Sequence, residues 1–159
     1  MKPLVGEMAP DFSAEVVRPG VLESETVRLS ELRGRRVVLV FYPKDSTPGC
    51  TTQACALRDG WADLQEQAEI FGVSIDGVAS HRKFITKQEL PYPLIADSDR
   101  SLVEAYGVWV EKSMYGKTFM GTERTTFVIG VEGSIEAVLE KVKPKAHFDE
   151  LKSALGVSS

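Results

Sequence analysis

Cys50 and Cys55 are the two cysteines of the chain, and the residues before Cys50 are of kinds that activate a thiol. Residues 37–42 are six apolar residues rich in β-branched side chains, a pattern typical of a buried strand. After a polar turn, Thr47 is predicted to be the N-cap of a helix and Pro48 its first residue, so Cys50 is third in the helix. The free N–H groups and the dipole at a helix N-terminus stabilise an anion. Cys50 is therefore predicted to be a nucleophilic thiolate, although the local pattern also leaves open an inert buried cysteine.

The spacing of the two cysteines limits how they could bond to each other. In an intact helix, residues five apart lie roughly 8–9 Å apart between Cα atoms and about 140° apart around the axis. A disulfide needs Cα atoms within about 7 Å and Cβ atoms that face each other. Cys50 and Cys55 can therefore bond only if the first turn or two of the helix unwinds. The spacing favours a redox switch, helical when reduced and locally unfolded when oxidised, over a structural disulfide.

The rest of the chain alternates predicted strands and helices and ends in a hairpin followed by a helix. Strands are expected at residues 27–29, 37–42, 70–76, 92–96, 125–129 and 135–142. Helical segments are expected at residues 30–34, 48–67, 80–90, 97–106 and 145–155. The start of the chain, residues 1–12, is expected to be irregular, and residues 114–121 a glycine-interrupted loop. This order predicts one domain, residues 1–159, with a thioredoxin-like fold: a central mixed β-sheet flanked by helices, with a C-terminal β-hairpin and helix.

Composition and charge argue against several functional classes. Apolar content of 43% and charged content of 26% are ordinary for a soluble globular protein. The net charge of −4, without a basic tract, argues against nucleic-acid binding. The longest apolar run is far too short for a membrane helix. The N-terminal residues contain no apolar signal segment, so a cytoplasmic location is expected.

A metal site is not expected from the candidate ligands. Besides the two cysteines, the candidate zinc ligands are His81 and His147, and both are far away in the sequence. A zinc site needs about four ligands at characteristic spacings. Neither histidine has a partner at catalytic spacing. Both are interpreted as incidental residues, at the surface or half-buried.

The run at residues 41–59 resembles the active-site segment of peroxiredoxins. Pro43, Thr47 and Cys50 stand at the spacing of that family's motif, and the whole run is similar to the bacterioferritin-comigratory-protein, or Q-type, subfamily. Further similar segments occur in the family's order over nearly the whole chain, at residues 9–12, 107–112, 115–117 and 124–127. Ser46 stands where the subfamily leads us to expect asparagine, outside the catalytic pattern.

The resemblance implies a thiol peroxidase, an antioxidant enzyme of cell redox homeostasis that reduces hydrogen peroxide and small organic hydroperoxides to water or alcohol. Cys50 would be the peroxidatic cysteine and would become a sulfenic acid. Thr47 would hydrogen-bond to the thiolate and the peroxide, and Pro43 would shield the thiolate from water. Arg124 would hold the thiolate and polarise the O–O bond. Backbone N–H groups of Gly49 and Cys50 would complete the peroxide pocket.

The same resemblance implies how the oxidised enzyme is recycled. Cys55 would be the resolving cysteine of an atypical 2-Cys enzyme, forming an intramolecular disulfide that thioredoxin or a similar dithiol reduces. No metal, haem, flavin or nicotinamide cofactor is implied, and a monomer is expected. Two alternatives remain: a thiol–disulfide oxidoreductase on the same fold, which usually has two residues between its cysteines instead of the four found here, and a non-catalytic redox sensor.

Overall fold

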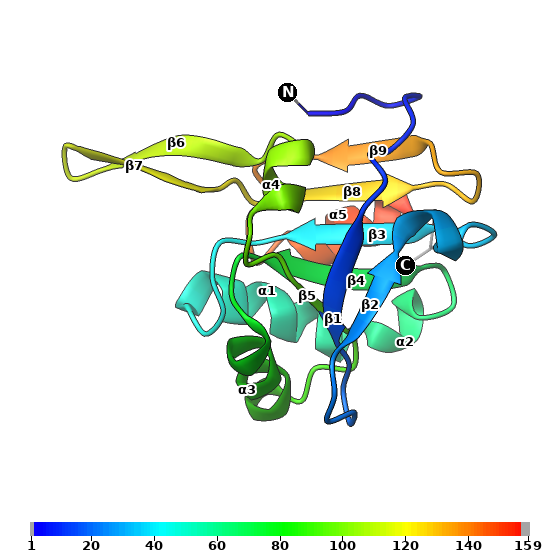
Figure 1. Cartoon of the computed structure of the whole chain (residues 1–159), viewed down its shortest axis with the longest axis horizontal. Coiled ribbons are helices and arrows are strands. Elements are labelled where there is room, and N and C mark those ends of the chain that lie inside the picture. Colours follow the sequence, from blue (N-terminus) through cyan, green and yellow to red (C-terminus); the bar gives the residue numbers. More distant parts are fainter. Residues whose placement is uncertain (1, 157–159) are drawn as a thin grey trace.

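A seven-stranded mixed β-sheet forms the centre of the computed structural model, which describes residues 2–156. The strand order is β2-β1-β5-β4-β3-β8-β9, and β6 and β7 form a separate two-stranded sheet (Figure 1). The strands are β1 (Ser13–Val17), β2 (Glu25–Arg28), β3 (Val37–Phe41), β4 (Glu69–Ser74), β5 (Leu94–Ala96), β6 (Trp109–Met114), β7 (Lys117–Thr122), β8 (Thr125–Ile129) and β9 (Ile135–Leu139). The helices are η1 (Leu29–Leu32), α1 (Pro48–Asp59), α2 (Trp61–Leu64), α3 (Val78–Gln88), α4 (Ser101–Ala105) and α5 (His147–Ala154). The predicted fold class is confirmed.

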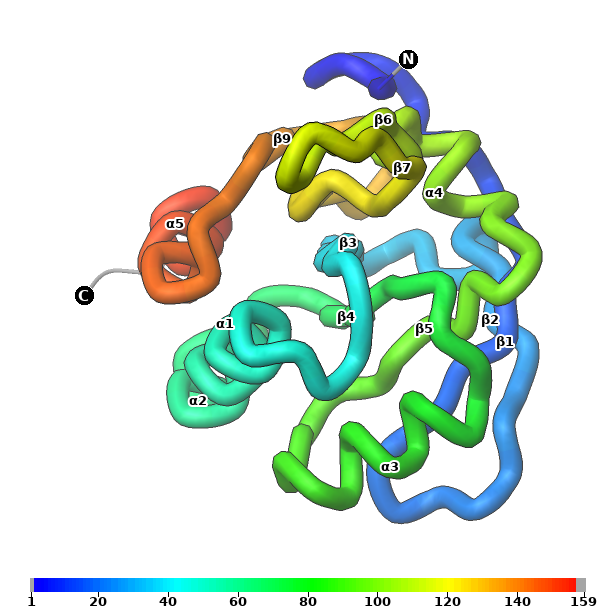
Figure 2. Tube along the Cα trace, turned by 90° about the vertical axis from the view of Figure 1, so that its left-hand side faces the viewer, coloured from blue at the N-terminus to red at the C-terminus, as the bar shows by residue number. Residues whose placement is uncertain are grey.

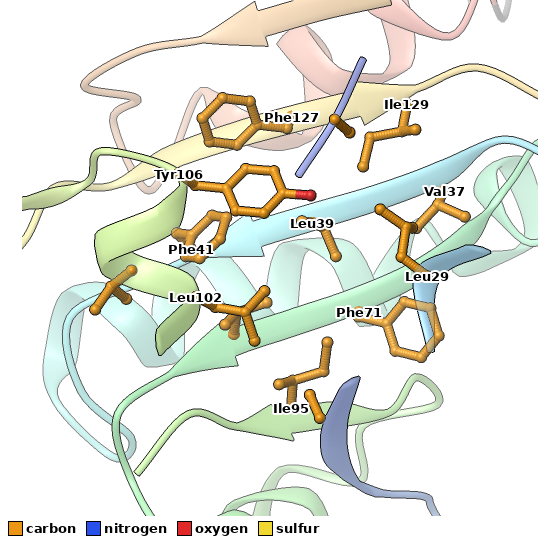
Figure 3. Packing of buried hydrophobic residues seen from close by; sticks show 14 of the residues in the cluster. Leu29, Val37, Leu39, Phe41, Phe71, Ile95, Leu102, Tyr106, Phe127 and Ile129 are labelled. Carbon is orange, nitrogen blue, oxygen red and sulfur yellow. The ribbon is translucent and has the colours of Figure 1, made fainter. Parts of the chain in front are cut away.

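Strand β3 lies between β4 and β8 and is buried on both faces. All five of its residues are buried, and their side chains alternate between two hydrophobic clusters. Figure 2 shows α4 on one side of the sheet and α1, α2 and α5 on the other. In the cluster beside α4, the rings of Phe41, Tyr106 and Phe127 pack together, with centroids 5.1–5.7 Å apart (Figure 3). Because both faces are covered, the strand is apolar throughout, which is why the sequence identified it correctly.

The helix that carries both cysteines is shorter than predicted. It ends at Asp59, and a separate short helix, α2, follows, whereas the sequence predicted one helix to residue 67. Gly60 lies at the break, with φ −99° and ψ 13°. A Cβ atom on Gly60 would lie 2.1 Å from the ring of Phe148, so α5 packs directly onto this backbone. The apolar spacing continues across the break because α1 and α2 bury the same side, with Leu57 and Leu64 both in the core.

Residues 114–121 were predicted to be a loop, and this prediction is wrong. They complete a β-hairpin in which β6 pairs antiparallel with β7, and the hairpin projects from the body of the molecule (Figure 1). Tyr115 and Gly116 form its turn, and both have positive φ, 52° and 77°. Such angles at both turn residues are typical of a type I′ hairpin turn. Most β7 side chains are exposed, so they lack the apolar alternation by which strands are recognised.

Strand β1 was also missed. It pairs antiparallel with β2 on one side and β5 on the other, and its burial pattern alternates only partly.

Within residues 2–156, no helix has the length and apolar character needed to cross a membrane.

The arrangement of three elements positions the chemistry. The loop from β3 to α1 begins where β3 ends, and the antiparallel register places Phe41 opposite Thr125, the first residue of β8. The residue before β8, Arg124, is therefore beside the start of that loop. The segment at residues 140–146, which leads into α5, passes the same place, since the backbone N–H of Val142 donates to the Arg124 carbonyl at 3.0 Å.

Candidate active site

Cys50 is the third residue of α1, as predicted, and its side chain is almost wholly buried. Thr47 has the extended backbone of an N-cap, and its carbonyl accepts the first helical hydrogen bond, from Thr51 N at 2.8 Å. Pro48 occupies the first helical position, where a missing N–H costs nothing. Helix geometry leaves the N–H groups of Gly49 and Cys50 without an intrahelical partner. These donors place partial positive charge beside the thiol.

Arg124, the residue directly before β8, contacts this thiol. Its Nη2 donates to Cys50 Sγ at 3.5 Å, and its Nη1 donates to the Oε1 of Gln53. The guanidinium is thus held at two points, and the two nitrogens face different acceptors. A guanidinium held in this way presents planar N–H donors to the sulfur and to any negatively charged group beside it. The structure therefore brings together Cys50 and Arg124, which are 74 residues apart in sequence.

Gly49 provides the space in which the guanidinium lies. A Cβ atom at this position would be 3.2 Å from Arg124 Nη2 and 3.5 Å from the Cγ of Pro144. Contacts as short as 3.2 Å force a neighbour to move by a few tenths of an ångström. The absence of a side chain on Gly49 therefore lets Arg124 approach the helix N-terminus closely.

The loop before α1 holds the two other predicted residues. Thr47 is an N-cap by its backbone only: its hydroxyl donates to the Lys44 carbonyl at 2.9 Å and makes no capping bond, so the prediction of a capping side chain is wrong. A hydroxyl has one proton, and that of Thr47 is in the hydrogen bond to the Lys44 carbonyl. Pro43 is half-buried at the start of the loop. Ser46 has a φ of 62°, a left-handed conformation that asparagine adopts more readily than serine, which explains why asparagine suits this place.

Cys55 lies on the same helix but outside this cluster. Both cysteines are free thiols, and Cys55 is half-buried, with its Sγ donating to the Oε1 of Gln88 at 3.4 Å. Gln88 is the last residue of α3, and its backbone carbonyl accepts a hydrogen bond from Arg58 Nη1 at 2.7 Å. The second half of α1 is therefore attached to α3 through Gln88. Arg58 also pairs with Asp59, with Nε and Oδ1 3.0 Å apart.

His81 is fully buried, so the prediction of an incidental surface or half-buried residue is wrong. Its Nδ1 lies 2.6 Å from the Oδ2 of Asp45, in the loop before α1, and its Nε2 lies 2.8 Å from the Ile95 carbonyl. The Asp45 carboxylate also accepts from the hydroxyls of Tyr42, at 2.6 Å, and Ser80, at 2.8 Å. This network joins the active-site loop to α3 and β5. No local pattern predicts this network, because His81 and Asp45 are 36 residues apart in the chain.

We expect His81→Ala to lower the free energy of unfolding by about 3–5 kcal/mol, because the carboxylate of Asp45 would remain buried without its nitrogen partner. Asp45→Asn is the matched control, since its amide can donate to His81 and accept from Tyr42 without carrying a charge. Urea denaturation at neutral pH measures both variants. A loss below about 1 kcal/mol for His81→Ala would mean that the contact contributes no more than an exposed ion pair.

Gln53 and His147 are functional candidates that the sequence analysis missed. Gln53 is buried one helical turn after Cys50, so its place on the same helix face was a signal that the sequence contained. His147 is fully buried, which again contradicts the prediction of an incidental surface or half-buried residue. Burial and the nearby charge of Arg124 lower the pKa of His147 to about 4.

Among residues 2–156, no group of three or more His, Cys, Asp or Glu side chains is arranged to hold a metal ion.

A buried thiol at a helix N-terminus, facing an arginine held at two points, is suited to nucleophilic chemistry, and the comparisons with known proteins identify the family. The model of the AhpC/TSA family matches residues 5–138. The chain belongs to this family. Its relatives within the family include peroxiredoxins of the Bcp and Q branch.

Three of these peroxiredoxins illustrate the similarity. The putative peroxiredoxin Bcp of Coxiella burnetii is 43% identical, covering 95% of this chain and 97% of its own. Peroxiredoxin Bcp of Bacillus subtilis is also 43% identical, covering 95% and 94%. A structure of the Xanthomonas campestris bacterioferritin comigratory protein, whose study concerns its alkyl peroxide reduction activity, superposes with a TM-score of 0.85 at 35% identity, covering 96% and 98%.

Membership in this branch settles the kind of enzyme. As a peroxiredoxin, the protein is a thiol-dependent peroxidase on a thioredoxin-like fold. Every relative named above matches the chain over nearly its whole length, so the resemblance does not depend on the motif at residues 43–50 alone.

Proposed function

We propose that Cys50 is the peroxidatic cysteine of this peroxidase. Its thiolate sulfur attacks one oxygen of a hydroperoxide, and the S–O bond forms as the O–O bond breaks. The other oxygen takes a proton and leaves as water, or as an alcohol from an organic hydroperoxide. Cys50 loses two electrons and becomes a sulfenic acid, while the peroxide gains them.

The observation that carries this proposal is the contact between Arg124 Nη2 and Cys50 Sγ at 3.5 Å. The guanidinium can stabilise the thiolate before the reaction and the charge on the peroxide oxygens during it. The N–H groups of Gly49 and Cys50 complete the proposed peroxide pocket. Pro43 shields the sulfur from water. Thr47 hydrogen-bonds to the peroxide once its hydroxyl leaves the Lys44 carbonyl.

Cys55 is proposed as the resolving cysteine. Its sulfur attacks Sγ of the Cys50 sulfenic acid, a disulfide forms, and water leaves. Both cysteines lie on α1, so the helix must unwind locally, as the geometry of a helix requires. That unwinding has to break the bond between Cys55 and Gln88 and strains the neighbouring bond from Arg58.

A dithiol protein of the thioredoxin type is the proposed reductant of that disulfide, by two successive thiol exchanges. We place the protein in the cytoplasm, where a reducing environment keeps such thiols free. We also propose that it acts as a monomer, because Cys50, Cys55 and Arg124 all come from one chain and no second subunit is needed to complete the site.

The proposal predicts a disulfide within one peptide. Cleavage after Lys44 and Arg58 releases residues 45–58, which contain both cysteines, so an intramolecular disulfide lowers the mass of this peptide by two hydrogens and makes it resistant to alkylation. We expect this product by mass spectrometry after one equivalent of hydrogen peroxide. Cys55→Ser should stop at the sulfenic acid of Cys50, which a dimedone probe traps. Recovery of two alkylated cysteines from the wild type after peroxide is consumed would contradict the proposal.

Hydrogen exchange on the same samples tests the accompanying change in shape. Amides of residues 48–58 should exchange faster in the disulfide form, because α1 is partly unwound. The peptide covering α5, whose hydrogen bonds need not change, serves as the internal reference. Equal protection of α1 in both redox states would rule out local unfolding.

A further inference from the structure

His147 is a buried side chain for which the peroxidase chemistry gives no obvious use. It is the first residue of α5 and has no exposed surface. Its Nδ1 lies 3.1 Å from the Nε2 of Gln53, and its Nε2 lies 2.7 Å from the Oγ1 of Thr126. Gln53 is itself 98% buried and is bonded to Arg124. The side chains of Arg124, Gln53, His147 and Thr126 thus form one continuous chain of hydrogen bonds.

The direction of every bond in this chain is fixed by Arg124. A guanidinium has only donors, so the atom of Gln53 that faces it must be the carbonyl oxygen. The amide nitrogen of Gln53 then faces His147, to which it donates. The Nδ1 of His147 must therefore carry a lone pair, and the proton of the neutral ring is on Nε2, donating to Thr126. The lowered pKa of His147, about 4, agrees with a neutral ring.

The hydrogen-bond chain starts at Arg124 and ends at Thr126, only two residues further along the sequence. Arg124 directly precedes β8 and Thr126 is the second residue of β8, while Gln53 is on α1 and His147 on α5. Two helices and a strand therefore hold one guanidinium. Without an acceptor at position 147, the NH2 group of Gln53 would be buried without a partner, and only the bond to Arg124 would hold the amide. The lone pair of His147 gives the Gln53 amide its second fixed point.

We propose that His147 is a positioning residue of the peroxidase reaction: as a hydrogen-bond acceptor it orients Gln53, and through Gln53 it holds Arg124 against Cys50. This inference rests on the proposed role of Arg124. His147 touches neither the sulfur nor the peroxide, and its contribution is the orientation of a group that does. A displacement of a catalytic group by about 1 Å can cost on the order of 10²-fold in rate, so a second layer of contacts of this kind has a measurable effect.

Variants at position 147 separate the hydrogen-bond acceptor from simple packing. His147→Leu fills similar space without an acceptor, and we expect it to slow the oxidation of Cys50 by about 10- to 100-fold. His147→Asn can place its carbonyl oxygen where Nδ1 lies, and we expect it to recover most of that loss. Leu151→Ala, in the core on the same helix, is the control for loss of stability and should leave the oxidation rate of the folded protein unchanged. Equal rates in the Leu and Asn variants, or an equal loss in Leu151→Ala, would overturn the proposal.

Two readouts keep this test separate from that of the proposed function. The rate at which iodoacetamide alkylates Cys50, measured against pH, reports its thiolate without any peroxide, and His147→Leu should shift that profile to higher pH. In the wild-type protein, nitrogen NMR should find the Nδ1 of His147 unprotonated and Nε2 protonated at neutral pH. A protonated Nδ1 would overturn the proposal even if the protein is a fast peroxidase. Slow peroxide oxidation of the wild type, with the expected alkylation shift and NMR signals, would instead count against the proposed function alone.

Discussion

Replacing Cys50 with serine is expected to abolish thioredoxin-coupled peroxide reduction. A serine hydroxyl at the same position receives the same N–H groups and the same Arg124 donor, but it does not ionise at neutral pH and cannot carry the two-electron oxidation to a sulfenic acid. The fold should not change, since the substitution replaces one buried sulfur by oxygen. Consumption of NADPH in an assay with thioredoxin and its reductase, with hydrogen peroxide as substrate, measures the loss.

The same assay on the wild type distinguishes a peroxidase from the two alternative functions, a thiol–disulfide oxidoreductase and a non-catalytic redox sensor. Many turnovers per protein molecule would exclude a passive redox sensor. A thiol–disulfide oxidoreductase would reduce insulin disulfides, and its Cys50 would react with peroxide no faster than an ordinary free thiol. Cys55→Ser is the matched variant, because it removes the other cysteine but keeps Cys50. It should retain fast first oxidation in stopped flow and lose efficient recycling by thioredoxin. Residual steady-state activity in Cys50→Ser would show that another group attacks the peroxide.

The sequence predicted the parts of this molecule in which neighbours along the chain determine the structure. The buried strand β3, the start of α1 and the position of Cys50 follow from apolar runs, Pro48 and Thr47, all of which act locally. The hairpin of β6 and β7 was missed because its side chains are exposed and show no apolar pattern. Phe148 packs against the backbone at Gly60 from 88 residues away, an approach that no local signal predicts.

The polar contacts around the site show the same limit more clearly. Asp45 with His81 and Gln53 with His147 are buried pairs whose members come from different elements. Their side chains are of the polar kind that sequence patterns assign to the surface, and only the fold reveals that they satisfy each other. Arg124 was found through the family resemblance, not through spacing. The structure supplies the physical reason for its position: the register of β8 against β3.

Arg124→Ala is expected to slow the reaction of Cys50 with hydrogen peroxide by about 10²–10³-fold, the usual effect of removing one fixed donor from a developing negative charge. The loss has two sources. Without the guanidinium the sulfur is less often a thiolate, and the transition state loses a donor to the peroxide oxygens. Arg124→Lys keeps the charge but not the planar fork that contacts Cys50 and Gln53 together, so it should recover only part of the rate.

Rates of alkylation and of peroxide oxidation, measured on the same variants, show how much of the loss comes from a smaller thiolate fraction and how much from the missing donor in the transition state. Alkylation by iodoacetamide depends on the thiolate but not on cleavage of an O–O bond. We expect Arg124→Ala to slow peroxide oxidation more than alkylation, and the ratio of the two losses gives the part that Arg124 contributes in the transition state. Arg36→Ala, which removes an arginine bonded to Glu136 far from the site, is the matched control. Equal losses in the two reactions would mean that Arg124 acts only by keeping Cys50 ionised, and unchanged rates in both would remove it from the active site.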